Sequence, residues 1–176
     1  NNSPFVITEA NLTYLKTSHG KTQETRLFKG ISMYFKMQKK VKSRVLIYSK
    51  GLLDINVPKG YEKVEFEYEK FNKKYSVYVQ KTKDETRGQI EARYLFNTAF
   101  MDRFMQLQTS FKVGKMQCSI YDDTMLVLLQ TNRDLFEINP LFKKIDDINN
   151  YQTLFDEFAS VLSFLEILNL SSKTGL

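Results

Sequence analysis

The sequence is poor in the residues on which many classes of small protein depend. It has one cysteine, Cys118, one histidine, His19, no tryptophan, 3 prolines and 7 glycines. A single cysteine cannot form an internal disulfide, which excludes a disulfide-stapled secreted module. One histidine and one cysteine are also too few for a classical zinc or haem site. We therefore expect no metal and no cofactor.

The sequence also lacks the patterns of membrane-spanning and nucleotide-binding proteins. It has no run of about 18 apolar residues, so no membrane span is expected in it, and it has no signal-peptide pattern. It has no Gly-rich phosphate loop or dinucleotide fingerprint. Asp122-Asp123 is too short for a calcium loop, which needs spaced oxygen ligands. The chain begins with Asn1 rather than Met, so we expect it to be part of a longer protein.

What the sequence does contain suits one folded domain. Of its 176 residues, 42% are hydrophobic and 14% are aromatic. Charged residues make up 26% and are well mixed, which argues against disorder. We therefore interpret residues 1–176 as a single soluble domain with a sizeable core.

Alternating apolar residues predict that residues 1–80 are mostly β. Residues 31–37 alternate with a period of two, and 45–48 form a short apolar run. The basic segment between them is interpreted as the turn of a β-hairpin. Residues 62–69 alternate most regularly and predict a strand with one acidic face, and 75–79 predict the next strand.

The first helical period appears in the middle of the chain. Phe96, Phe100 and Phe104 recur every four residues and predict an amphipathic helix near 97–109. Asn97 can cap its start. Residues 89–95 predict a short preceding helix, so the whole of 88–109 is expected to be helical.

A second helical stripe predicts a long C-terminal helix near 150–168. Phe155 and Leu162 widen this stripe, so we expect the helix to be deeply packed. The residues of the stripe itself are Leu154, Phe158, Val161, Leu165 and Leu168.

Between the helices, residues 115–130 predict a β-hairpin. Residues 116–120 alternate, 121–124 have turn chemistry and 125–129 are apolar. The alternation makes Cys118 a small buried hydrophobe rather than a nucleophile. The fold class expected is α+β, with a mainly antiparallel sheet of about six to eight strands. The strand order cannot be derived from the sequence.

One stretch resembles the signature of a known family. The residues that carry the resemblance are Phe71, Lys73, Tyr75, Val77, Tyr78, Glu91, Ala92, Arg93, Tyr94, Leu95, Ala99, Phe100 and Met101. They are similar to the strand, the Glu-Ala-Arg-Tyr motif and the helix start of the bacterial family called domain of unknown function 3137. Asp134-Leu135-Phe136-Glu137 resembles a late element of that family. The loop 81–89 is longer than the family usually has, and Asn97-Thr98 replaces its usual Thr-Pro.

The resemblance implies a location rather than a reaction. Members of the family are usually membrane proteins with two apolar helices ahead of this domain, which is expected on the cytoplasmic side. No activity, substrate or cofactor is established for them. We interpret the motif residues as structural, namely Phe71, Tyr75, Glu91, Arg93, Tyr94 and Phe100.

A cluster of basic residues is the favoured functional surface. The net charge of the chain is +6, and five of its cations fall close together: Lys36, Lys39, Lys40, Lys42 and Arg44. Such a cluster attracts anionic lipid or nucleic acid, and it can also be an ordinary solvated turn. We favour a membrane surface because the family that the chain resembles consists mostly of membrane proteins. The sequence has no RNA-binding motif of aromatic and basic residues, so nucleic acid is not expected.

The function predicted is a non-catalytic interaction or scaffold module tethered to the cytoplasmic face of a membrane. Possible partners are the membrane surface and a membrane protein. Two alternatives stay open. One is an enzyme with a site around Glu91 and Arg93, where an acid and a guanidinium could orient an anionic ligand. The other is a nucleic-acid binder that uses residues 36–44.

Overall fold

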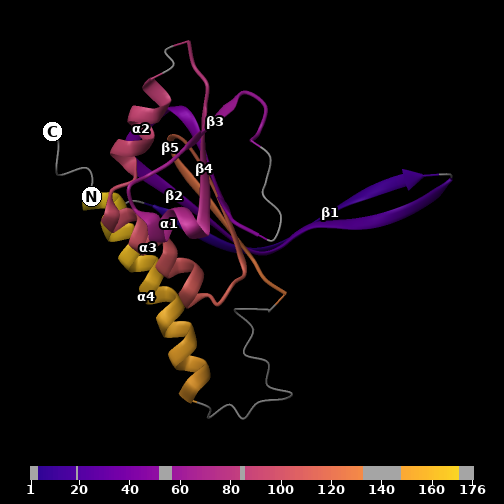
Figure 1. Ribbon diagram of the computed structural model, residues 1–176. Coiled ribbons are helices and arrows are strands. Elements are labelled where there is room, and N and C mark those ends of the chain that lie inside the picture. Colours follow the sequence, from indigo (N-terminus) through magenta and orange to yellow (C-terminus); the bar gives the residue numbers. More distant parts are fainter. Residues whose placement is uncertain (1–3, 19, 52–56, 84–85, 133–147, 171–176) are drawn as a thin grey trace.

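The computed structural model describes residues 4–18, 20–51, 57–83, 86–132 and 148–170. Figure 1 shows the helices gathered on one side of the sheet and a long two-stranded arm projecting from its other side. The strands are β1 (Phe5–Ser18), β2 (Lys21–Ser49), β3 (Tyr61–Val64), β4 (Tyr75–Gln80) and β5 (Lys115–Gln130). The helices are α1 (Glu69–Lys74), α2 (Arg87–Leu95), α3 (Thr98–Ser110) and α4 (Ile148–Leu170).

Strand β2 is the centre of an antiparallel sheet. It pairs with β5 on one side, from Gly30 to Tyr48. Its other side pairs with β1 at one end and, through Val45–Ser49, with β4 at the other end. Strand β3 adds to the free side of β4. The α+β class and the mainly antiparallel sheet are therefore confirmed.

The sheet has five strands in the part of the chain that the structure describes, which is fewer than the six to eight predicted. Both predicted hairpins are single strands: β2 includes 31–37 and 45–48, and β5 covers 115–130 without a reversal. The registers of β2 and β5 shift between Lys36 and Val41 and again between Val41 and Val45, and Asp122 has a φ of 53°. Bulges let a strand take up extra residues by bending while its pairing continues. The turn-like residues therefore bend two paired strands instead of reversing them.

The predicted strand at 62–69 was also wrong in its second half. Strand β3 ends at Val64, and α1 begins at Glu69. The Asn72 side chain accepts a hydrogen bond from the Phe66 backbone N–H at 3.3 Å and donates another to its carbonyl oxygen. This side chain takes the place of a partner strand, so the backbone can turn into α1 without leaving those polar groups unpaired.

The predicted helices are confirmed in position. Helices α2, α3 and α4 cover the expected segments 89–95, 97–109 and 150–168. Asn97 caps α3, because its Oδ1 accepts from the Phe100 backbone N–H at 2.8 Å. In the part of the chain that the structure describes, no helix has both the length and the apolar character needed to cross a membrane.

Helix α4 is less deeply packed than predicted. Val161, Phe164 and Leu165 are buried, but Phe155 is 68% exposed and Leu162 is 55% exposed. The reason is that α4 packs on α3 and β2 through one stripe only. Phe158 of the predicted stripe is 42% exposed as well, while Glu157 and Ser160 are buried, so the packed face lies to one side of the predicted one.

Aromatic rings join the helices to the sheet. The Phe164 ring of α4 lies 5.5 Å from Phe35 of β2 and 5.4 Å from Phe100 of α3, measured between ring centroids. Phe104 continues the contact to Tyr75 at 5.3 Å and to Phe71 at 6.2 Å. Each buried ring contributes roughly 1.5–3 kcal/mol through its burial, and this cluster is therefore the main source of stability for the body of the protein.

The arm consists of residues 11–18 of β1 and 21–29 of β2, which pair with each other beyond the end of the sheet. Gly30 lies at its root, where β2 is paired with both Ala10 of β1 and Gln130 of β5. Gly30 has a φ of 153°, and a Cβ there would lie 1.9 Å from the carbonyl oxygen of Leu129. Only glycine fits where β5 approaches this closely.

Candidate functional site: a basic corner of the sheet

The five predicted surface cations lie where β2 bends. The register shifts of β2 fall within 36–45, and Asp122 of the bent part of β5 pairs with Val41. The two bends thus place a basic segment of one strand beside an acidic pair on the other. We call this region the basic corner, made of Lys36, Lys39, Lys40, Lys42 and Arg44.

Carboxylates of β5 engage two of the five cations. Nζ of Lys36 lies 2.6 Å from Oδ2 of Asp123, and Nζ of Lys40 lies 3.7 Å from Oδ1 of Asp122. The hydrogen bond between Lys36 and Asp123 raises the pKa of the lysine and lowers the pKa of the aspartate. These pairs reduce the charge that Lys36 and Lys40 present to a partner.

Two other cations stack on tyrosine rings. Nζ of Lys39 lies 3.7 Å from the centroid of the Tyr94 ring of α2, and Cζ of Arg44 lies 5.1 Å from the centroid of the Tyr121 ring of β5. Both rings are exposed, and so is Ile90, one helical turn before Tyr94. A cation over an aromatic face keeps its charge while the ring holds its position. The corner therefore combines fixed positive charge with exposed apolar surface.

Glu91 holds α2 against the bend. Its Oε2 accepts hydrogen bonds from the backbone N–H groups of Lys42 at 3.1 Å and Ser43 at 2.9 Å, and its Oε1 lies 3.2 Å from Nε of Arg87. Partial burial alone would raise the pKa of Glu91, but these hydrogen bonds outweigh it and hold the pKa below its usual value. The carboxylate thus accepts hydrogen bonds from two backbone N–H groups that the bulge leaves outside the regular pairing of the sheet.

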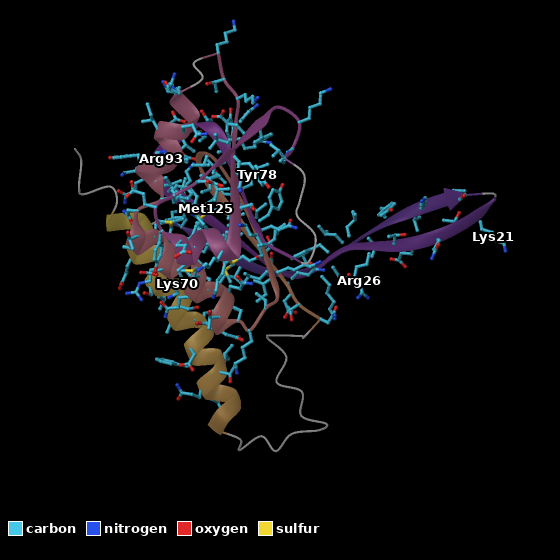
Figure 2. The ribbon with its side chains drawn as sticks, viewed as in Figure 1. Lys21, Arg26, Lys70, Tyr78, Arg93 and Met125 are labelled. Atoms are coloured by element: carbon cyan, nitrogen blue, oxygen red, sulfur yellow. The ribbon has the colours of Figure 1, made fainter. Side chains whose placement is uncertain are left out.

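Arg93 does not join Glu91. Residues two apart on a helix point to different sides. Figure 2 shows Arg93 on the outer side of α2, away from the sheet. It lines an open hollow of about 450 Å³, together with Phe66, Glu67, Tyr68, Phe96, Asn97, Thr98 and Met101. The structure therefore does not bring together the two residues of the predicted enzyme site.

The comparisons with known proteins can be set beside this geometry. A family described as "Protein of unknown function (DUF3137)" matches residues 26–170, which is most of the chain.

The chain belongs to this family.

The DUF3137 match starts within the arm and ends at the last residue of α4. Among solved structures, the chain is similar to the mycobacterial trehalose monomycolate transport factor A, TtfA. The TM-score is 0.45 and the identity 11%, over 89% of this chain and 70% of that chain. A likeness this low carries no argument about function. No curated protein matches the chain.

The DUF3137 motif residues occupy different environments. Phe71, Tyr75 and Phe100 are buried in the aromatic cluster, while Tyr94 is exposed beneath Lys39. The Tyr75 hydroxyl donates to Oε1 of Gln108, and burial raises its pKa. Most of the motif thus builds the core, and Glu91 and Tyr94 connect that core to the basic corner.

The remaining candidates carry no site in the described part of the chain. Cys118 is buried as predicted, and burial raises the pKa of its thiol, so it is not a ready nucleophile. The described residues contain no cluster of three or more potential metal-ligating side chains. His19 and the segment 134–137 lie outside the described residues.

Two elements of the corner had no recognisable signal in the sequence. The residue types at 121–124 predict a turn, yet Asp122 and Asp123 pair with Lys40 and Lys36. Tyr121 lies far along the chain from Arg44. Only the paired bending of β2 and β5, which is not local in sequence, brings these residues together.

Proposed function

We propose that this DUF3137 domain is a non-catalytic interaction module that works at the cytoplasmic face of a membrane and contacts anionic headgroups through the basic corner. The observation that carries the proposal is the stacking of a half-buried cation, Lys39, and an exposed one, Arg44, on two exposed tyrosine rings. Each cation close to an anionic surface adds about 1 kcal/mol of attraction. Tyrosine is enriched at membrane interfaces because its ring is apolar and its hydroxyl polar.

The contacts of the five cations support a choice among them. Lys36 and Lys40 are paired with Asp123 and Asp122. Lys39 and Arg44 lie over rings, and the Lys42 side chain is exposed. We therefore assign the headgroup contact to Lys39, Lys42 and Arg44.

The hydrogen bonds of Glu91 support a role other than catalysis. A catalytic carboxylate must reach a substrate, but both oxygens of Glu91 are occupied by Lys42, Ser43 and Arg87 of the chain itself. Its lowered pKa is explained by these contacts and needs no ligand.

Vesicle co-sedimentation tests the proposal. The chain should bind vesicles that contain phosphatidylglycerol, release them as salt rises, and ignore vesicles of phosphatidylcholine alone. Replacing Lys39, Lys42 and Arg44 by Gln should weaken binding by about 3 kcal/mol, roughly 100-fold. The matched control replaces Lys70, Lys74 and Lys115, which are exposed and distant in sequence from the corner.

Two outcomes would overturn the proposal. One is equal binding to neutral and anionic vesicles, or equal loss in the corner variant and its control. The other is that the chain ignores anionic vesicles but binds a short DNA or RNA duplex through the same three cations, which would favour nucleic acid as the ligand of the corner.

A further inference from the structure

The arm presents a strand edge that no other described strand occupies. Strand β1 pairs with β2 alone among the described residues. Figure 1 shows the arm standing clear of the helices and of the rest of the sheet. Along the outer edge of β1, the arm therefore presents backbone N–H and C=O groups of the kind that pair with another strand.

The two long edges of the arm differ in their protection. On the β2 side, Lys21, Glu24, Arg26 and Lys29 place charges along the edge. A bulge at Leu27 also breaks the pairing there, because Leu12 and Thr13 of β1 face Phe28 and Arg26. Charges and bulges are the devices by which proteins keep an edge strand from pairing with other chains.

The β1 edge has less of this protection. Between residues 11 and 17 its only charged residue is Lys16, and it contains no proline. Leu12 is 53% exposed and Leu15 is 72% exposed, and these two side chains point to opposite faces of the ribbon. Each face of the arm thus presents an apolar side chain beside a strand edge that carries a single charge.

We propose that residues 11–17 of β1 receive an extended, acidic segment of a partner protein as an added β-strand. The backbone of β1 calls for an extended segment, because only a strand can satisfy a row of edge groups. Leu12 and Leu15 provide one apolar contact on each face of the added strand. The site is separate from the basic corner and does not depend on the proposed membrane contact.

The charge of the arm argues for an acidic occupant. The arm carries one carboxylate, Glu24, and four cations: Lys16, Lys21, Arg26 and Lys29. Figure 2 shows Lys21 at the tip of the arm and Arg26 nearer its root, so the positive charge extends along the ribbon. A second copy of the chain would bring an arm with the same positive excess, which disfavours edge pairing between two copies.

A designed peptide can serve as the probe. The full chain, without lipid, would be titrated into a labelled peptide in which Glu alternates with Val and Thr, and binding followed by fluorescence anisotropy. We expect binding, together with slower amide hydrogen exchange at residues 11–17. Replacing Glu by Lys in the peptide, or methylating its alternate backbone nitrogens, should weaken binding at least tenfold.

Charge-matched variants separate the edge from the net charge of the arm. The double variant L12E/L15E and its control T22E/Q23E each add two carboxylates to exposed positions of the arm, the first pair on β1 and the second on β2. The β1 variant should lose at least tenfold more affinity than the control. Unchanged exchange in the strands of the body would show that both variants remain folded.

Three results would overturn this inference. The first is equal loss of affinity in the two double variants. The second is binding that is insensitive to methylation of the peptide backbone. The third is a concentration-dependent dimer, seen by sedimentation, that L12E/L15E abolishes, because the occupant of the edge would then be a second copy of the chain.

Discussion

Strand β2 is exposed in one half and buried in the other. From Lys21 to Lys29, in the arm, no residue is buried, whereas from Ile31 to Ile47 nearly every second residue is. Both halves are paired β-structure, but only the second has β5 beside it and helices beneath it. Burial of alternate side chains stabilises the body, while the arm relies on pairing with β1 alone.

This difference has a thermodynamic meaning. An isolated two-stranded hairpin is marginally stable in water, whereas a sheet with a covered face unfolds only with the whole domain. A partner strand can therefore stabilise the arm. Substitutions in the body should lower the free energy of unfolding of the whole domain. The first two predictions that follow test that division, and the third tests the hydrogen bonds that stabilise the bend within the body.

The largest effect is expected from the aromatic cluster. Phe104→Ala removes a fully buried ring of the body and should lower the free energy of unfolding by about 4 kcal/mol. Leu15→Ala removes an exposed side chain of the arm and should change it by less than about 0.5 kcal/mol. Urea unfolding followed by circular dichroism measures both. Similar losses in the two variants would erase the distinction between arm and body.

A somewhat smaller effect is expected where the two regions meet. Gly30→Ala places a Cβ against the carbonyl of Leu129 and should cost about 3 kcal/mol, because β2 must move away from β5. Gly20→Ala is the control: its φ is also positive, at 73°, but a Cβ there meets nothing within 4 Å. That variant should lose about 1 kcal/mol at most, confined to the tip of the arm. Equal melting temperatures for G30A and the wild type would contradict the close approach at the root.

The smallest of the three effects concerns Glu91, whose hydrogen bonds hold α2 against the bend of β2 at the basic corner. Glu91→Ala leaves the N–H groups of Lys42 and Ser43 without their carboxylate and should cost about 2 kcal/mol at neutral pH. The folded-state pKa of Glu91 is lowered, so its stabilisation is present above the pKa of the unfolded chain and is lost as the pH falls through the folded-state value.

The pH dependence provides the check on that prediction. Unfolding curves of the wild type and Glu91→Gln, measured from neutral pH down into the acid range, should converge as the wild-type carboxylate becomes protonated. A constant difference across this range would mean that the charge of Glu91 does not stabilise the bend. Lys70→Gln, at an exposed site in α1, serves as the control and should match the wild type throughout.

The sequence was sufficient for elements whose signal is local. The Phe96, Phe100 and Phe104 spacing located α3, and the alternation of residues 31–37 located the buried half of β2. It was insufficient at 121–124, because the same residues can reverse a strand or bend it. The choice depends on whether the neighbouring strand bends at the same level, which is a property of the pair.

The candidate site shows the same limit. The sequence identified the basic cluster but not its partners, because Asp122 and Asp123 lie far along the chain from Lys36 and Lys40. The sequence singled out Glu91, but it did not predict that backbone N–H groups donate hydrogen bonds to its carboxylate. Side-chain identity does not encode which main-chain groups a bulge leaves unpaired.

The pairing of β1 with β2 bears on where this domain can be divided. The DUF3137 match starts at residue 26, after β1 has ended, yet β1 pairs with β2 from Phe35 to Lys21 and stacks the Phe5 ring 6.4 Å from that of Phe35. A polypeptide cut at the start of the match would keep the core helices but leave this margin of β2 bare and its Phe35 ring less shielded. Strand β1, which lies before the family match, therefore completes the sheet that the match includes. A boundary chosen for expressing this domain, or for fusing it to another protein, belongs ahead of Phe5.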